Sequence, residues 1–218
     1  MTVERILAPL EQLNRTPGKR LAFSLVIMAF LVSGYLILNN SLAHKVDLLL
    51  PLDEQIPYWP WTVGIYVTLH PMYFIAAFTL EPRRYVHVLL GVIAMTLISF
   101  ILFMLITSHY PRPSPEAWAH SLWKPIIDIL VSVDAPGNTC PSLHVSTSLY
   151  LGWVLKDRAY GLGWVIWGVL LSLSTLTLKQ HYVWDWVGGS LLAVMTLWVQ
   201  TRCGAFTRAS TSLGQHRG

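Results

Sequence analysis

Two short polar stretches interrupt the apolar second half of the chain, and each contains a histidine. The first ends in Pro141-Ser142-Leu143-His144 and opens directly into an apolar run. A proline and a serine just before such a run are typical of a helix N-terminus. Free backbone N–H groups and the positive end of the helix dipole make that end attractive to anions. Because His144 adds a proton donor to the first turn, we expect an anion site with acid–base capacity here.

The second stretch runs from Lys179 to Asp185 and contains His181 four residues before the aspartate. Residues four apart share one face of a helix, so Asp185 is placed to bind one ring nitrogen of His181. Such a contact fixes the tautomer of the imidazole and leaves the other nitrogen free as a base or a nucleophile. A structural His–Asp pair would show the same spacing, so the pair alone does not establish a reaction.

Two cations strengthen the case for chemistry. Arg112 lies between two prolines, and a guanidinium matches the geometry of phosphate. Lys179 adds positive charge two residues before His181. Each cation alone is typical of side chains that reach the membrane surface. Together with two histidines, a carboxylate and a helix N-terminus, they indicate a site for phosphoryl chemistry.

The composition places these residues in a membrane protein. Of the 218 residues, 54% are hydrophobic and 12% are charged, with a mean hydropathy of +0.51. Soluble proteins carry about 25% charged residues. The net charge of +4 is therefore a sign of topology, because lysine and arginine mark cytoplasmic loops. We expect the lipid bilayer as the surrounding partner and no nucleic acid.

Six apolar segments predict an all-α bundle of six transmembrane helices, since a span takes roughly 20 residues. The segments are 21–38, 61–80, 86–106, 143–155, 161–178 and 182–201. The fourth is short and would cover about 20 Å of a hydrocarbon core about 30 Å thick. Its start would therefore lie below the membrane surface.

We predict three parts of the chain, namely a cytoplasmic interfacial segment over 1–20, the membrane domain over 21–201 and a disordered cytoplasmic tail over 202–218. No cleaved signal peptide is expected, because the N-terminus is polar and the first apolar run is long enough to span. The connection 107–141 is expected to hold an interfacial helix, with Trp118, Leu122, Ile126, Ile129 and Val133 on one face, or a lid beside the site. A loop of this length is seldom without a role.

Positive charge predicts the orientation. Both termini are cytoplasmic and all basic clusters fall on one side if there are six spans; the clusters lie at 15–20, 83–84, 156–158 and 202–208. Arg112, His144 and His181 then share the opposite, extracytoplasmic face, although they were not used to count the spans.

These motifs resemble the signature of the type-2 phosphatidic acid phosphatase superfamily, which reads Lys-x6-Arg-Pro, Pro-Ser-Gly-His and Ser-Arg-x5-His-x3-Asp. The chain has Arg112-Pro113, Pro141-Ser142-Leu143-His144 and Ser174-Thr175-x5-His181-x3-Asp185 in the same order and spacing. The resemblance covers roughly residues 60–200. It implies an enzyme that acts on lipid phosphates or diphosphates without a metal or other cofactor.

The resemblance also implies a role for each residue. His181 would attack phosphorus and form a phosphohistidine, Asp185 would orient His181, and His144 would protonate the leaving group. The phosphate oxygens would be held by Arg112, Lys179, Ser142 and the backbone N–H of Leu143.

Three positions depart from the family pattern. Leu105 stands in the place of the family's lysine, Thr175 in that of its arginine, and Leu143 in that of its glycine. Lys179 is the candidate substitute for the arginine. His109 lies near the position of the missing lysine but is out of register with it.

The leading hypothesis is a lipid phosphatase whose site opens to the outer leaflet of a membrane, with a bacterial inner membrane and its periplasmic side as the expected location. The pattern looks nearer the branch with inositolphosphotransferase-type proteins, so a lipid phosphotransferase with a hydroxyl acceptor is an alternative.

A transporter or binding protein without catalytic activity is a further alternative, which the two missing cations favour. Retention of three ionisable groups argues against it, because such groups are costly at membrane depth. A metal site formed by His144, His181 and Asp185 is the weakest alternative, because no pattern of supporting ligands accompanies it.

Overall fold

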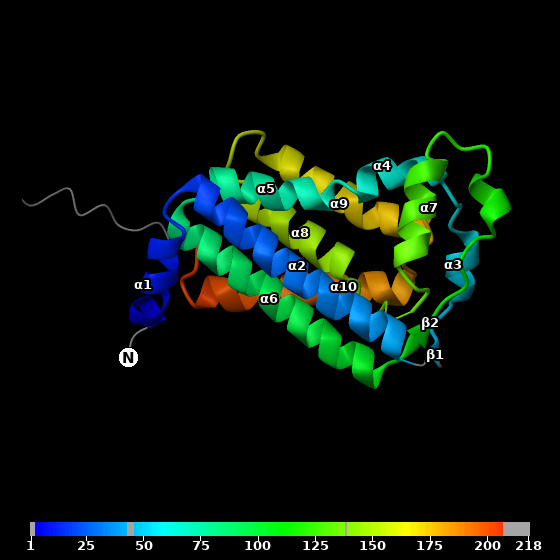
Figure 1. Cartoon of the computed structure of the whole chain (residues 1–218), viewed down its shortest axis with the longest axis horizontal. Helices are drawn as coiled ribbons and strands as arrows, with labels where there is room; N and C mark the ends of the chain where they lie inside the picture. The colour runs from blue at the N-terminus through cyan, green and yellow to red at the C-terminus, as the bar shows by residue number, and fades with distance from the viewer. Residues whose placement is uncertain (1–2, 43–45, 138, 207–218) are drawn as a thin grey trace, which may run out of the picture.

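The computed structural model of the chain describes residues 3–42, 46–137 and 139–206 (Figure 1). Within these residues the regular secondary structure is helical apart from two-residue strands, β1 (Val46–Asp47) and β2 (Ser108–His109), which pair in parallel. The prediction of an all-α protein is confirmed, although the strand pair was not predicted. The predicted tail lies outside the described residues from 207 onward.

The long helices fall on the predicted apolar segments. They are α2 (Pro17–Ser41), α5 (Leu69–Thr79), α6 (Pro82–Leu105), α8 (Leu143–Leu155), α9 (Leu162–Thr177) and α10 (Val183–Arg202). The second segment is divided, because a 3-10 turn, η1 (Pro60–Thr62), and the short α4 (Val63–Tyr66) precede α5. Pro71 lies in the first turn of α5, where its missing N–H removes no helical hydrogen bond.

Three helical segments are long and apolar enough to cross a membrane: Pro17–Ser41, Pro60–Thr79 and Pro82–Leu105. The chain is accordingly an integral membrane protein. The helices α8 and α9, with 13 and 16 residues, are shorter than a full span of about 20. Six spans with both termini in the cytoplasm therefore stay a prediction. A helix, α1 (Val3–Leu13), occupies much of the predicted N-terminal interfacial segment.

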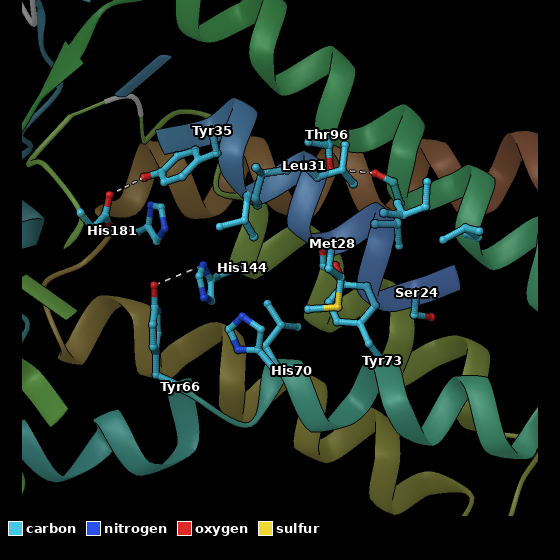
Figure 2. A pocket seen from close by; sticks show the side chains of 18 of the residues that line it. Ser24, Met28, Leu31, Tyr35, Tyr66, His70, Tyr73, Thr96, His144 and His181 are labelled. Atoms are coloured by element: carbon cyan, nitrogen blue, oxygen red, sulfur yellow. Dashed lines mark hydrogen bonds between the residues drawn. The ribbon is translucent and has the colours of Figure 1, made fainter. Parts of the chain in front are cut away.

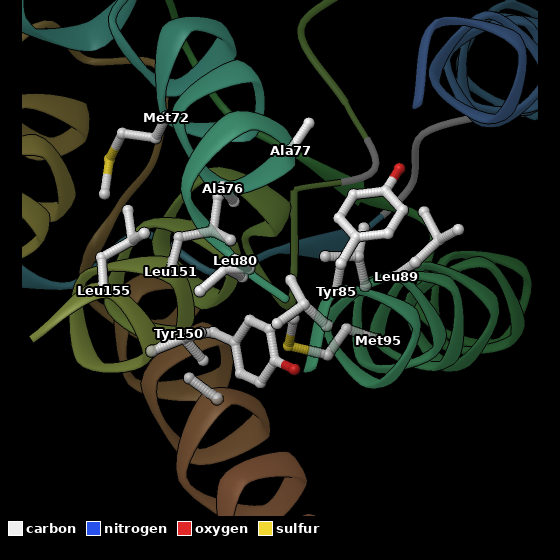
Figure 3. Packing of buried hydrophobic residues seen from close by; sticks show 14 of the residues in the cluster. Met72, Ala76, Ala77, Leu80, Tyr85, Leu89, Met95, Tyr150, Leu151 and Leu155 are labelled. Atoms are coloured by element: carbon white, nitrogen blue, oxygen red, sulfur yellow. The ribbon is translucent and has the colours of Figure 1, made fainter. Parts of the chain in front are cut away.

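The helices run lengthwise in one bundle, in which α8 contacts α5, α6, α9 and α10 (Figure 1). A Cβ atom at Gly168 in α9 would lie 2.5 Å from the carbonyl oxygen of Ser148 in α8. Only glycine allows so close an approach of two backbones. The core around α8 is closely packed (Figure 3), and it includes Met72, Leu80, Met95, Tyr150 and Leu151.

The two ends of the bundle differ in chemistry. At one end Arg20, at the start of α2, donates to the carbonyl oxygen of Ala77 in α5 at 2.6 Å. Arg84, at the start of α6, donates to that of Val154 in α8 at 2.7 Å. Basic residues from separate predicted clusters therefore gather at this end.

The opposite end, which we call the motif end, holds the starts of α8 and α10. It also holds α3 (Pro51–Gln55), α7 (Lys124–Val133) and the strand pair (Figure 1). Both polar stretches of the sequence therefore belong to one end of the bundle.

The connection between α6 and α8 contains a helix, as predicted, but its faces differ from the prediction. A 3-10 turn, η2 (Pro115–Trp118), precedes α7. Trp118 is buried and donates to Asp128 at 2.9 Å, whereas Leu122, Ile129 and Val133 are exposed. The prediction that Trp118 shares a face with these residues is wrong, because the break between η2 and α7 turns it inward to pack with Ile127.

Candidate active site

Ser142 anchors the start of α8 against α10. Its Oγ accepts a hydrogen bond from the N–H of Val145 at 3.2 Å, which caps the helix. Its own N–H donates to the carbonyl oxygen of Asp185 at 3.1 Å. Since both groups are engaged, Ser142 fixes the position of His144 relative to α10, and its contact with phosphate stays a prediction.

Gly189 sets the distance between the two polar stretches. A Cβ atom at this position in α10 would lie 2.6 Å from the carbonyl oxygen of Ser142 and 2.9 Å from Cβ of Val145. Backbone atoms cannot rotate aside as a flexible side chain can. The glycine therefore permits the approach that brings His144 near His181.

We expect Gly189→Ala to lower turnover by about tenfold to 100-fold, because a shift of about 1 Å in a catalytic group can cost this much. Gly163→Ala is the matched control, since a Cβ there meets its nearest atom at 3.7 Å, and turnover should stay within about twofold. Both variants are compared by lipid phosphate hydrolysis and by thermal unfolding in detergent. Unchanged turnover in Gly189→Ala would show that this contact does not set the active geometry.

His181 and Asp185 face each other at the start of α10. Nδ1 of His181 lies 3.5 Å from Oδ2 of Asp185, which is longer than a hydrogen bond of about 2.7–3.2 Å. The buried carboxylate also accepts from the N–H of Tyr182 at 3.0 Å, so the helix start holds it in place. Catalytic contacts are often long in empty sites, and a small rotation of the imidazole closes this one.

His144 has a partner that the sequence did not reveal. Its ring stacks on Tyr66, with centroids 4.1 Å apart and an interplanar angle of 16°. The Tyr66 hydroxyl lies 3.2 Å from Nδ1 of His144. With the tyrosine as donor, the neutral imidazole carries its proton on Nε2. That nitrogen is buried without a partner among the described groups.

The two histidines line one cavity, together with Leu143 and His70 (Figure 2). Their ring centroids are 6.2 Å apart. A phosphorus atom between the rings would be in reach of both, with one ring as nucleophile and the other as acid. The sequence motifs therefore meet in space, while the chemical roles of their residues stay predictions.

Arg112 lies behind an aspartate that the sequence analysis missed. Its Nη1 donates to the carbonyl oxygen of Asp134 at 2.5 Å, and its Nη2 lies 3.6 Å from Oδ2 of that residue. Nε and Nη2 are buried without a hydrogen bond to other described groups. Arg112 is absent from the described lining of the cavity, and its guanidinium is held by Asp134.

Asp134 itself lines the cavity. It accepts hydrogen bonds from Tyr35 at 2.8 Å and from Asn39 at 2.7 Å, both on α2. Burial raises the pKa of its carboxyl, and Tyr35, Arg112 and His181 oppose that rise. Two polar residues four apart near the end of an apolar span are a signal that could have pointed to this cluster.

The side chain of Lys179 is held by α3. Its Nζ donates to the carbonyl oxygen of Asp53 in α3 at 2.6 Å, and it is absent from the described lining of the cavity. The Asp53 carboxylate in turn accepts from the N–H of Val183 at the start of α10 at 2.8 Å. Lys179 thus tethers α3 beside the site, and its contact with phosphate stays a prediction.

The positions that depart from the family pattern bring no cation to the cavity in the described part of the chain. Leu105 is exposed at the end of α6, and His109 is exposed in β2. Thr175 is buried, and its carbonyl oxygen accepts from the N–H of His181 at 3.2 Å. Over the described residues, no cluster of three His, Cys, Asp or Glu side chains forms a metal site.

Comparison with known proteins identifies the family of the chain. The model of the PAP2 superfamily matches residues 58–199, which is more than half of the chain and includes all three motifs. No curated protein and no solved structure matches the chain.

Proposed function

The chain belongs to the PAP2 superfamily, and from this premise we propose that it is a lipid phosphatase that works through a phosphohistidine on His181. The observation that carries the proposal is the cavity shared by His144 and His181, whose ring centroids are 6.2 Å apart. Lipid phosphates and diphosphates are the proposed substrates, and no metal takes part.

The proposed reaction has two steps. In the first, Nε2 of His181 attacks phosphorus and the bond from phosphorus to the leaving oxygen breaks. His144, as the imidazolium ion whose Nδ1–H donates to the Tyr66 hydroxyl, gives that oxygen its Nε2 proton and becomes neutral. The nearby Asp185 stabilises the positive charge that develops on the ring of His181. In the second, water attacks phosphorus, the phosphorus–nitrogen bond breaks, and His144 takes up the proton of the water.

The proposed topology has six spans, with both termini in the cytoplasm and the motif end outside. Its support is the gathering of basic residues at the other end, where Arg20 and Arg84 contact the ends of α5 and α8. Cationic side chains are enriched on the cytoplasmic side of membrane proteins. The proposed location is a bacterial inner membrane with the site facing the periplasm.

A phosphotransferase of the inositolphosphotransferase-like branch is the second candidate. The observation that favours it is the site's cation set, in which Thr175 replaces the family's arginine and Lys179 is turned toward Asp53. Both candidates share the phosphohistidine and differ only in the group that accepts the phosphoryl unit.

We expect the purified protein to release phosphate from a lipid phosphate in the presence of EDTA at an unchanged rate. Loss of activity on chelation, restored by added metal, would contradict the metal-free reaction. The acceptor is identified by labelling the protein with radioactive phosphate and then adding water alone, glycerol or inositol. Release as free phosphate in all three supports the phosphatase, whereas transfer to glycerol or inositol supports the phosphotransferase.

A further inference from the structure

The cavity continues far beyond the histidines. It extends between α2, α5, α6 and α8, with contributions from all four helices. Figure 2 shows His144 and His181 toward one end of it and Ser24 at the other, with Met28 and Leu31 between them. The two histidines therefore lie at one end of a long cavity between the helices.

The wall between the two ends is mostly apolar. On α2 the lining residues include Met28, Leu31 and Tyr35, whose spacing of three and four puts them on one helix face. On α6, Val92 and Thr96 line the space, and the Thr96 hydroxyl is satisfied by the carbonyl oxygen of Val92 at 2.9 Å. Such a wall suits a hydrocarbon, with polar side chains such as His70, Tyr73 and Thr147 also lining it.

The far end is closed by a polar network whose members satisfy one another. Oγ of Ser24 lies 2.6 Å from the Tyr85 hydroxyl, which donates to the carbonyl oxygen of Arg20 at 2.8 Å. Arg20 is held by Ala77 and by the carbonyl oxygen of Asn14 at 3.0 Å. An apolar chain pushed into this network would break buried hydrogen bonds, which is unfavourable. The network therefore acts as a floor.

We propose that this cavity holds one hydrocarbon chain of the lipid substrate, with the phosphate between the histidines and the chain end at the Ser24–Tyr85 floor. The inference rests on the proposed function. Because the bilayer is as apolar as the cavity, moving the hydrocarbon chain from one to the other adds little to the binding free energy. The cavity therefore acts mainly by selecting chains of a suitable length and shape.

The dimensions set an expected limit on chain length. Ser24 and Tyr35 are eleven positions apart on α2, or about 16 Å at 1.5 Å per residue. A carbon–carbon bond of about 1.5 Å at a tetrahedral angle advances an extended chain by about 1.25 Å. The space between Tyr35 and the floor therefore holds roughly a dozen carbons by these values.

The first test narrows the cavity at Leu31, about 6 Å from the Tyr35 level by helix rise. We expect Leu31→Trp to lower kcat/KM for a twelve-carbon alkyl phosphate by at least about tenfold, the scale of a steric misfit in an apolar pocket. A four-carbon alkyl phosphate should be turned over within about twofold of the wild-type value. Val26→Trp, exposed on the same helix, is the matched control and should leave both substrates unaffected.

A second variant, Val92→Phe, narrows the cavity from α6. It keeps the inference testable if Leu31→Trp does not fold. Turnover of the four-carbon substrate and thermal unfolding in detergent verify that each variant folds. An equal loss for both chain lengths in the two folded variants, or no loss for either, would overturn the inference.

The second test does not depend on turnover. The probe is a twelve-carbon alkyl phosphonate with a terminal diazirine, which is cross-linked by light and located by mass spectrometry. We expect labels near Ser24 and Met28 in the wild-type protein and their loss in Leu31→Trp. Labels confined to outward residues such as Val26 would overturn the chain site. Labels in the cavity of a protein that hydrolyses no lipid phosphate would support the chain site and refute the proposed function.

Discussion

His181→Asn is expected to abolish turnover, with a loss on the order of 10⁴- to 10⁶-fold, the scale for removal of a covalent nucleophile. The Nε2 atom of His181 faces away from Asp185 and is the atom that would bond to phosphorus. Asparagine keeps a polar side chain of modest size but forms no phosphohistidine. Radioactive phosphate from a lipid phosphate should therefore label the wild-type protein and leave this variant unlabelled.

The control for His181 is His120→Asn, which changes an exposed histidine in the connection between η2 and α7. It should keep turnover within about twofold and keep the label. A label on His144 in the His181→Asn protein would reverse the two assigned roles. Full turnover in that variant would reject the phosphohistidine altogether.

His144→Asn is expected to give the second largest loss, and the loss should depend on the leaving group. For an alkyl phosphate the departing alkoxide needs a proton, so turnover should fall by about 10²- to 10⁴-fold. For p-nitrophenyl phosphate the leaving group departs as a stable anion, so the loss should be within about tenfold, because little acid catalysis is then missing. Both rates are measured on the same preparation.

Tyr66→Phe provides the companion to this experiment. It keeps the ring that stacks on His144 and removes the hydroxyl that lies 3.2 Å from Nδ1. Tyr66→Phe should lower turnover of the alkyl phosphate more than that of p-nitrophenyl phosphate, as His144→Asn does, but by a smaller factor. The reason is that the tautomer of His144 is then less strongly fixed. Equal losses for the alkyl and nitrophenyl substrates in His144→Asn would show that this histidine binds phosphate and does not act as the acid.

Hydropathy and capping residues were sufficient to place most of the long helices, although not all of their ends. The fourth segment was predicted over 143–155, and α8 spans Leu143–Leu155, because Ser142 caps it and the charged stretch from Lys156 follows it. The first segment was predicted too short at both ends. Its helix begins at Pro17 after the cap Thr16, and a proline in the first turn favours an early start that apolar content alone does not reveal.

The geometry of the site was harder to predict from the sequence, because the orientation of its side chains depends on partners that are distant in the chain. Lys179, whose contact with phosphate stays a prediction, donates to the carbonyl oxygen of Asp53, 126 positions earlier. Arg112 meets Asp134 across the long connection, and His144 meets Tyr66 from another span. Motif spacing within a helix predicts which residues share a face, but these contacts depend on how loops pack over the bundle.

The unpartnered nitrogens of the site also bear on the stability of the whole protein. Nε2 of His144 and Nε of Arg112 are buried without a hydrogen bond to other described groups, and each such group costs about 1–3 kcal/mol. A ligand that binds only the folded state raises its stability in proportion to the logarithm of ligand concentration. In the proposed function the phosphate of the substrate would meet these groups, so we expect the concentration of oxyanions around the protein to be one of the variables that determine its melting temperature.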